Sequence, residues 1–488
     1  MDEPNPLKAR SQARQFFALI IIGSATAQAL GMALKLPTQL VANDISRWCT
    51  VWSLLERGTY AIDDCPWQSQ TQDKVLKPAP FQTVPPGGKP VEHYYSSKPP
   101  LLPTMIAGLL YPIRKVTGVS LDVTYNQERN ARWVAKEAPD EPGRVKYELE
   151  TPKEPVKWPV YVFYFKPIVV LFNVVPLLIF LVFYVRVLDR YADGDWAWFV
   201  SLFAAAWGTQ LLVFDLTLNN HTIAAYSAFF AIYAFLRIEN DGLRSPLYFA
   251  LAGLFAAFCA CNELPAALFG LALFAILLAK FPRSTLFYFV PAAALPCLAF
   301  LGTQWLAMGQ LRPAYEEFGT KSYQYYGSYW NTPLEFDWFN KHPEPYPVYL
   351  FHMTFGHHGV FSLTPIFLFS LYAIFLHMIG RLRRMTDVAW LTAFLTAAML
   401  AFYTWNPKAR NYGGSTQGLR WLFWLFPFWL VLLPMGIERG QTHRGFRWLT
   451  LAALMLSVFS VGYALRSPWS HPWILDAMEH LNMYKLER

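Results

Sequence analysis

Three charged residues stand next to apolar segments of this sequence and are candidates for chemistry: Asp44, Lys98 and Arg420. An Asp carboxylate can act as a general base, or it can cap the first turn of a helix. A Lys ammonium and an Arg guanidinium both bind phosphate, and the guanidinium does so in bidentate fashion. The same basic side chains could instead extend to the polar surface of a membrane. The residue types therefore indicate acid–base chemistry on a phosphate-bearing substrate, with structural roles as the alternative.

Each of the three residues is expected to be positioned by a helix. Asp44 precedes residues 45–55, whose pattern predicts an amphipathic helix with two tryptophans on its apolar face, typical of a helix lying on a bilayer. Lys98 precedes Pro99-Pro100, which can start a short apolar helix over 100–113, and free N–H groups at a helix start favour anions. Arg420 opens a very aromatic apolar segment.

Further polar residues lie in loops or at the ends of apolar segments, where they suggest function because they are expensive at membrane depth. Glu263 lies in a tight turn, where it would meet lipid head groups unless it contacts the site. The aromatic run 323–330 could stack on sugar rings or form an interfacial belt. The substrate-binding candidates are Asp215, Asn220, His221, Glu263, His357, His358, Asn411 and Tyr412.

Three histidines within seven residues, His352, His357 and His358, could bind a divalent metal. Neither a fourth ligand nor the usual spacing of a structural zinc site accompanies them. We therefore expect them to form hydrogen bonds to substrate or to loop backbone, and we expect the protein to need no cofactor.

The composition indicates a multi-spanning membrane protein. Of 488 residues, 54% are hydrophobic and 15% are charged, against about 25% charged in a typical soluble domain. This balance excludes a disordered chain, a coiled coil and an ordinary cytosolic enzyme. The net charge of +8 is spread among loops, so no basic face for nucleic acid is expected.

The apolar segments predict an all-α fold with about eleven transmembrane helices. The first follows basic residues and contains Ala25-Thr26-Ala27, which resembles a signal-peptide cleavage site, but the apolar run continues to Leu34 and favours an uncleaved helix. The expected spans are 16–34, 160–185, 196–214, 221–237, 246–261, 265–280, 285–308, 361–380, 386–404, 419–437 and 447–465.

Basic residues fall in alternate short loops, and the positive-inside rule then places the N-terminus in the cytoplasm and the C-terminal tail outside. The expected organisation is 1–34 (N-terminal tail and first span), 35–159 (first extracytoplasmic loop, with interfacial helices), 160–308 (spans two to seven), 309–360 (second extracytoplasmic loop), 361–465 (spans eight to eleven) and 466–488 (extracytoplasmic tail). Cys49 and Cys65 both lie in the first loop and could pair in an oxidising compartment.

An Asp shortly after the first span, an amphipathic helix and the segment YYSSKPPLLP (94–103) resemble the GT-C superfamily of polyprenyl-phosphate-dependent glycosyltransferases. The chain is most similar to the branch of protein O-mannosyltransferases and lipid A aminoarabinose transferases. By motif the resemblance covers about residues 1–115, and by topology the remainder. The glycine-rich segment 410–415 ahead of Arg420 is also similar to a late loop of this family.

The resemblance implies that Asp44 is the catalytic acid/base and that Lys98-Pro99-Pro100-Leu101 lies near the lipid phosphate. We therefore expect inverting transfer of a sugar from a polyprenyl phosphate, at the outer face of a bacterial cytoplasmic membrane. The partners would be this lipid-linked sugar, membrane lipids and an acceptor that is a protein, lipid or glycan. The alternatives are a lipid-linked sugar flippase and an inactive lipid-binding homologue; a transporter would need polar groups near the bilayer midplane.

Overall fold

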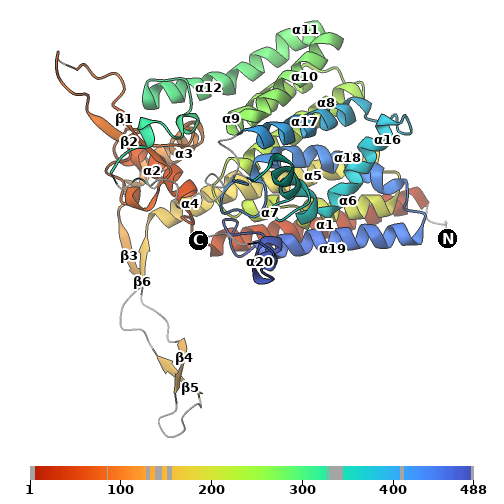
Figure 1. Cartoon of the computed structure of the whole chain (residues 1–488), viewed down its shortest axis with the longest axis horizontal. Helices are drawn as coiled ribbons and strands as arrows, with labels where there is room; N and C mark the ends of the chain where they lie inside the picture. Colours follow the sequence, from red (N-terminus) through yellow and green to blue (C-terminus); the bar gives the residue numbers. More distant parts are fainter. Residues whose placement is uncertain are drawn as a thin grey trace.

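The computed structural model describes residues 6–84, 86–127, 132–137, 145–150, 156–326, 328, 344–406 and 411–484. It is mostly helical, and eight helices are long and apolar enough to cross a membrane (Figure 1). This confirms the prediction of a helical, multi-pass membrane protein. The eight are Gln12–Lys35, Tyr161–Tyr191, Asp195–Phe214, His221–Glu239, Pro282–Met308, Thr386–Trp405, Arg420–Glu438 and Arg444–Ala464.

Three further expected spans form shorter apolar helices, Pro246–Asn262, Leu264–Lys280 and Pro365–Met378, so the count of eleven stays a prediction. The segment expected over 361–380 is not one continuous helix. It is broken at Thr364 (φ −130°, ψ 64°), because the residue before a proline avoids the helical conformation.

The elements of the bundle run roughly side by side (Figure 1). They are α1 (Pro6–Lys35), α4 (Tyr161–Val169), η2 (Val170–Val174), α5 (Val175–Tyr191), α6 (Asp195–Trp207), α7 (Leu211–Phe214), α8 (His221–Glu239), α9 (Pro246–Asn262), η3 (Leu264–Ala266), α10 (Ala267–Lys280), α11 (Pro282–Ser284), η4 (Thr285–Phe289), α12 (Val290–Met308), α15 (Val360–Leu363), η8 (Pro365–Phe367), α16 (Leu368–Met378), α17 (Thr386–Trp405), η10 (Arg420–Leu425), α18 (Phe426–Glu438) and α19 (Arg444–Ala464).

The remaining elements lie in the large loops and the C-terminal tail. They are α2 (Ala42–Glu56), η1 (Gln68–Gln70), β1 (Lys74–Pro78), β2 (Glu92–Ser96), α3 (Leu101–Thr117), β3 (Thr124–Gln127), β4 (Arg132–Glu137), β5 (Val145–Glu150), β6 (Val156–Pro159), η5 (Ala314–Glu317), η6 (Lys321–Tyr323), α14 (Tyr346–Thr354) and α20 (Trp473–His480).

Helices α8 and α18 form the centre of the bundle, and most of their residues are buried. Helices α1, α12 and α19 lie at its periphery and expose most of their apolar surface. The small residues Ala25 and Ala29 of α1 are fully buried, and Gln28 accepts a hydrogen bond from Trp207 Nε1 of α6 at 2.9 Å. The first apolar segment is thus packed as a helix of the bundle.

At one end of the bundle, the loops expected to carry cytoplasmic basic residues contact one another through ion pairs. Lys280 Nζ lies 2.7 Å from both Glu239 and Asp387, and Arg14 lies 2.8 Å from Asp195. Further pairs at this end are Arg190–Asp241, Arg237–Asp241 and Arg384–Asp193. Alternate loops therefore meet at one end of the bundle, as the predicted topology requires.

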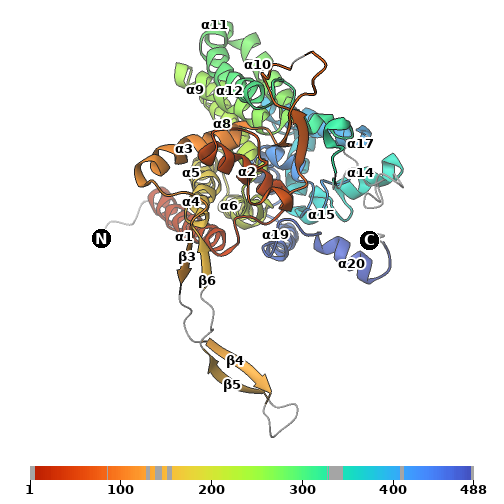
Figure 2. The ribbon, with the colours of Figure 1, turned by 90° about the vertical axis from the view of Figure 1, so that its left-hand side faces the viewer.

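The first large loop covers the opposite end of the bundle (Figures 1 and 2). It contains strands that the sequence analysis did not predict: three antiparallel two-stranded sheets, β1–β2, β3–β6 and β4–β5. The pairs β3–β6 and β4–β5 form an arm that extends away from the bundle (Figure 2). The strands of these sheets are short and alternate with polar turns. In the sequence, such strands give a weaker pattern than the long apolar segments do.

The two helices expected in this loop are present, but they differ in their surroundings. Trp48 and Trp52 of α2 are buried, and Trp48 stacks on Phe165 of α4 with ring centroids 3.9 Å apart. The expectation that these tryptophans face a bilayer is therefore wrong, because the protein itself covers them. Helix α3 exposes Leu109 and Val116, which suits a helix at a membrane surface.

The close packing of helices α18 and α16 can be tested by a substitution at Gly436. A Cβ atom at Gly436 would lie 1.8 Å from the carbonyl oxygen of Phe369, a clash with backbone that no rotamer can relieve. Gly436→Ala should lower the thermal unfolding midpoint in detergent, because separating the helices costs at least the roughly 1–3 kcal/mol of core overpacking. The matched control is Gly302→Ala in α12, where nothing lies within 4 Å and the midpoint should not fall. Equal midpoints for the two variants would contradict this packing.

Candidate functional site

Charged and polar side chains from distant parts of the chain meet at the end of the bundle covered by the first loop. They come from the start of α2, the segment before β1, the β2–α3 turn, the start of α8, the turn before η3 and the start of η10. The residues are Asp44, Arg47, Asp73, Lys98, Asn220, His221, Glu263 and Arg420. Asp44, Lys98 and Arg420 were predicted from the sequence, and so were Asn220, His221 and Glu263.

The Asp44 side chain is fully buried in the first turn of α2. It accepts hydrogen bonds from the backbone N–H groups of Leu40 and Val41 and from the hydroxyl of Thr217, each at 3.0 Å. Val41, and not Asp44, occupies the N-cap position, because the helix begins earlier than expected. Burial raises the pKa of the Asp44 carboxyl to about 6, although these hydrogen bonds act to lower it.

Lys98 lies in the turn between β2 and α3, and its Nζ is 3.1 Å from Asp73 Oδ2. The turn is fixed by the N–H of Ser97, which donates to the carbonyl of Asp73 at 3.0 Å, and by Pro100, after which α3 begins. Burial lowers the pKa of Lys98, and the positive charges of Arg47 and Arg420 lower it further, whereas Asp73 raises it. The expected helix after Pro99-Pro100 is therefore present, with Lys98 directly before it.

Arg47 is a site residue that the sequence analysis did not single out. Its guanidinium donates to the carbonyl of Asn43 at 2.9 Å and to the side chain of Asn220. Burial lowers the pKa of Arg47 to about 10, with Arg420 lowering it and Asp73 and Asp44 raising it. The available signal was its position three residues after Asp44, which places both side chains on one face of α2.

Arg420 begins η10 directly after Gly418 and Leu419. Gly418 has φ +93°, a conformation that favours glycine, and this turn directs the chain into the bundle. The guanidinium lies over the ring of Trp469, 4.6 Å from its centroid. Its buried Nε has no hydrogen-bond partner among the described residues.

Glu263 faces this site. Its Oε1 accepts a hydrogen bond from Asn220 Nδ2 at 2.6 Å and pairs with His221 Nδ1. Glu263 is buried, so the turn that carries it presents the carboxylate to the protein interior and not to lipid head groups. A chain of contacts thus runs from Arg47 through Asn220 to Glu263 and His221.

Arg47, Lys98 and Arg420 are hereafter the cationic cluster. They lie close together, since the charge of Arg420 lowers the pKa of both Arg47 and Lys98, and the charge of Arg47 lowers the pKa of Lys98. Lys98 is paired with Asp73, whereas Arg47 and Arg420 form no salt bridge within the described part of the chain. Two guanidinium groups without a directly paired carboxylate thus lie next to a paired ammonium, while the negative charges of Asp44, Asp73 and Glu263 act on Arg47 from further away. Chemically, the arrangement can bind a phosphate beside the carboxyl of Asp44.

The other predicted site residues lie elsewhere. Asp215 is buried beside α8 and accepts a 2.6 Å hydrogen bond from the hydroxyl of Tyr226. Asn411 accepts a hydrogen bond from the N–H of Gly413 at 3.1 Å, which shapes the glycine-rich turn. His357, His358 and Tyr412 form a second cluster, in which the rings of His358 and Tyr412 stack with centroids 5.0 Å apart.

Part of the aromatic run 323–330 lies outside the described residues. Tyr323 and Tyr325 are buried, and Tyr325 packs edge-on against Tyr94, 5.2 Å away. In the first loop, the thiols of Cys49 and Cys65 are in contact, and this contact raises the pKa of the Cys49 thiol. Both are free thiols in this structure.

No family model matches this chain, and no curated protein or solved structure is significantly similar to it. The resemblance to the GT-C superfamily therefore rests on the sequence motifs alone. What the site does has to be argued from its geometry.

The pKa of Asp44 leads to a prediction on stability. Because this pKa is raised, the folded protein holds the Asp44 proton more tightly than the unfolded chain does. The stability gained from protonated Asp44 is therefore fully present below about pH 4 and is lost as the pH rises to 6. The loss corresponds to about 3 kcal/mol for a two-unit difference. Wild-type stability should therefore fall over this interval relative to Asp44→Asn, measured by thermal unfolding in detergent.

The exposed Asp64 of the same loop provides the control, because Asp64→Asn should leave the pH dependence of the wild type unchanged. A constant difference between wild type and Asp44→Asn from pH 4 to 7 would show that the Asp44 carboxyl titrates normally.

Proposed function

We propose that this protein transfers a sugar from a polyprenyl phosphate to an acceptor hydroxyl, with inversion at the anomeric carbon. The observation that carries the proposal is the cationic cluster beside Asp44, at one end of a membrane-type helix bundle. The two groups that such a reaction needs, a phosphate-binding centre and a base, lie next to each other there. No nucleotide is required, because the sugar arrives already activated on its lipid.

In the proposed step, the acceptor oxygen attacks the anomeric carbon as Asp44 removes the hydroxyl proton. The bond between the anomeric carbon and the phosphate oxygen breaks, and the electron pair leaves with the phosphate. Arg47, Lys98 and Arg420 stabilise the negative charge that accumulates there. A carboxyl pKa of about 6 suits this role, since the group is mainly ionised at neutral pH and is a stronger base than an ordinary Asp.

Asp44 is fully covered in this structure. The acceptor can reach it only if the segment just before α2, whose Leu40 and Val41 N–H groups bind the carboxylate, moves on substrate binding. Catalytic hydrogen bonds are commonly completed only in the substrate complex. The proposal thus includes a displacement of residues 36–41.

The lipid chain would bind along α3. Large apolar side chains of this helix are exposed, among them Met105 and Leu109, and a pocket of about 560 Å³ lies between α3 and α4. It is lined by Leu109, Ile113, Phe163 and Ile168 among others. The pocket begins about 12 Å along the helix axis from the start of α3, which Lys98 precedes by three residues. A polyprenyl chain with its phosphate at the cationic cluster could extend into this pocket.

We place the site on the extracytoplasmic side of a bacterial cytoplasmic membrane, with undecaprenyl phosphate as the carrier. The support is the meeting of the basic loops at the other end of the bundle, together with the positive-inside rule. The sugar would be a hexose or a pentose, and the acceptor a protein, lipid or glycan.

A second candidate function is binding of a lipid phosphate without transfer, as in an inactive homologue. The complete burial of Asp44 and its three hydrogen bonds favour it, because a residue held in this way can serve the fold alone. A transporter is less well supported, since the charged groups of the candidate site gather at one end of the bundle.

The role of Asp44 is tested by Asp44→Asn in the purified full-length protein. Release of undecaprenyl phosphate from a panel of undecaprenyl-phosphate-linked hexoses and pentoses should fall about 100-fold or more, because a positioned base contributes 10²–10⁴-fold. Asp64→Asn, in the same loop, should retain wild-type turnover. Equal activity of wild type and Asp44→Asn would remove Asp44 from catalysis, and no release by the wild type on any donor would favour the binding function.

The role of Arg420 is tested by binding of undecaprenyl phosphate itself. Arg420→Ala should weaken binding roughly 10- to 100-fold, because a charge-assisted hydrogen bond contributes about 1.5–3 kcal/mol. Arg283→Ala, an exposed basic residue at the other end of the bundle, is the control and should bind as the wild type does. Unchanged affinity in Arg420→Ala would exclude this residue from the phosphate site.

A further inference from the structure

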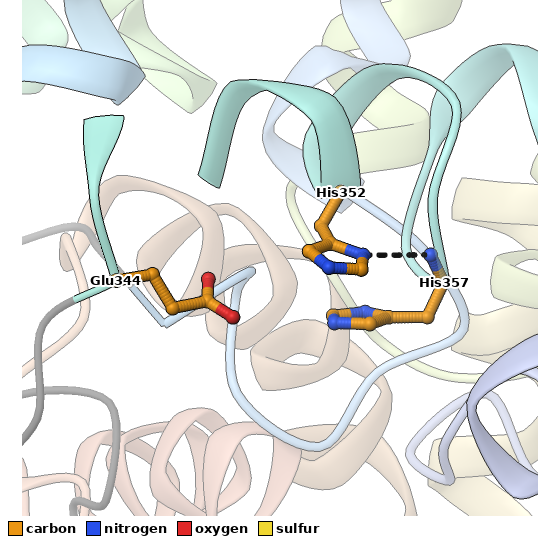
Figure 3. A group of neighbouring side chains, drawn as sticks. All are labelled: Glu344, His352 and His357. Atoms are coloured by element: carbon orange, nitrogen blue, oxygen red, sulfur yellow. Dashed lines mark hydrogen bonds between the residues drawn. The ribbon is translucent and has the colours of Figure 1, made fainter. Parts of the chain in front are cut away.

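His357 of the second cluster also belongs to a group of three potential metal ligands from one short stretch of chain. Glu344 lies just before α14, His352 lies in its last turn, and His357 follows in the next loop. One ligand atom from each residue lies within 4.8 Å of the other two. Figure 3 shows the Glu344 carboxylate facing the edges of the two imidazole rings, which stack with centroids 4.0 Å apart.

The structure assigns to Glu344, His352 and His357 a binding site for one divalent transition-metal ion, with zinc as the preferred metal. The sequence alone suggested His352, His357 and His358, with no carboxylate. In the structure, the third ligand beside the two histidines is Glu344 and not His358. Glu344 precedes His358 by fourteen residues, and helix α14 places it next to the histidines.

His357 is positioned as a ligand with a free nitrogen. It is fully buried, and its Nε2 has no hydrogen-bond partner among the described residues. Its Nδ1 lies 2.5 Å from Nδ1 of His358, so one of the two rings donates to the other. When His357 is the donor, its Nε2 carries a lone pair, and a partner on the second ring nitrogen is typical of metal-binding histidines.

His352 is available as the second imidazole. Its one hydrogen bond among the described residues comes from the N–H of His357 to Nδ1, at the long distance of 3.5 Å. Gly356 allows the two rings to approach, because a Cβ atom there would lie 2.2 Å from His352 Nδ1.

Two tyrosines hold the carboxylate. The hydroxyl of Tyr484 donates to Glu344 Oε1 at 2.8 Å, and the hydroxyl of Tyr412 donates to Oε2. Outer-shell hydrogen bonds of this type orient carboxylate ligands. The site therefore connects α14 with the glycine-rich loop and with the C-terminal tail.

The chemical types of the three ligands favour some metals over others. Two imidazoles and one carboxylate suit zinc, whereas Mg²⁺ and Ca²⁺ prefer sites made of oxygen alone. Ligands of one tetrahedral zinc lie about 3.3 Å apart, given metal–ligand bonds of about 2.0–2.1 Å. Since the ligand atoms lie within 4.8 Å of one another, binding would draw them together by up to about 1.5 Å and leave a fourth position for water or another ligand.

The experiment measures zinc in the full-length protein, purified without a histidine tag, stripped with chelator and titrated with ZnCl₂ in detergent. We expect one zinc per chain, a rise in the unfolding midpoint with Zn²⁺ but not with Mg²⁺, and a tetrahedral visible spectrum with Co²⁺. His357→Ala and Glu344→Gln should each lose stoichiometric binding. Tyr484→Phe should bind about 10- to 100-fold more weakly.

The control is His443→Ala, an exposed histidine in another loop, which should bind as the wild type does. Glu344→Gln keeps the shape of the side chain, so it decides the question even where His357→Ala fails to fold. Absence of stoichiometric zinc from the titrated wild type, or equal affinity in wild type and Glu344→Gln, would overturn the proposal. Neither result depends on glycosyl transfer, so the two proposals fail independently.

Discussion

Charged groups inside an apolar helix bundle have to be paired, hydrogen-bonded or neutralised, because the desolvation of an isolated ion costs several kcal/mol. The end of the bundle beneath the first loop satisfies this constraint in three ways. Lys98 is paired with Asp73, Asp44 is held by two backbone N–H groups and a hydroxyl, and Arg47 is bound by two asparagines. Of the four charged side chains, Arg420 has the least complete hydrogen bonding, because its buried Nε has no hydrogen-bond partner among the described residues.

The incomplete hydrogen bonding of Arg420 connects the fold to the proposed chemistry. A site for a phosphate needs positive charge that the protein does not itself neutralise, and that charge destabilises the protein until the ligand binds. The first loop makes such a site tolerable, because it buries Asp44 and supplies two backbone N–H groups, from Leu40 and Val41, to its carboxylate. The packing of Trp48 against Phe165 anchors α2 to α4, so the position of Asp44 depends on a contact between two aromatic rings.

The Glu344 site also contains a buried polar group without a hydrogen-bond partner among the described residues. A buried imidazole nitrogen facing a carboxylate is a centre that a cation would complete. Both clusters lie beside the glycine-rich loop, because Tyr412 precedes and Arg420 follows its glycines. The conformation of this loop therefore influences the phosphate-binding and the metal-binding proposals together, through separate side chains.

The sequence by itself determined the class of protein and the positions of the apolar helices. Both follow from composition and from runs of apolar residues, which are local properties of the chain. It also singled out Asp44, Lys98, Glu263 and Arg420, since charged residues are rare here and stand out. The tertiary structure decided which of these residues meet, and it added Arg47, Asp73 and Glu344, because loops far apart in sequence converge only after packing. It also buried Trp48 and Trp52, since an amphipathic pattern shows that a face will be covered and cannot show whether lipid or protein covers it.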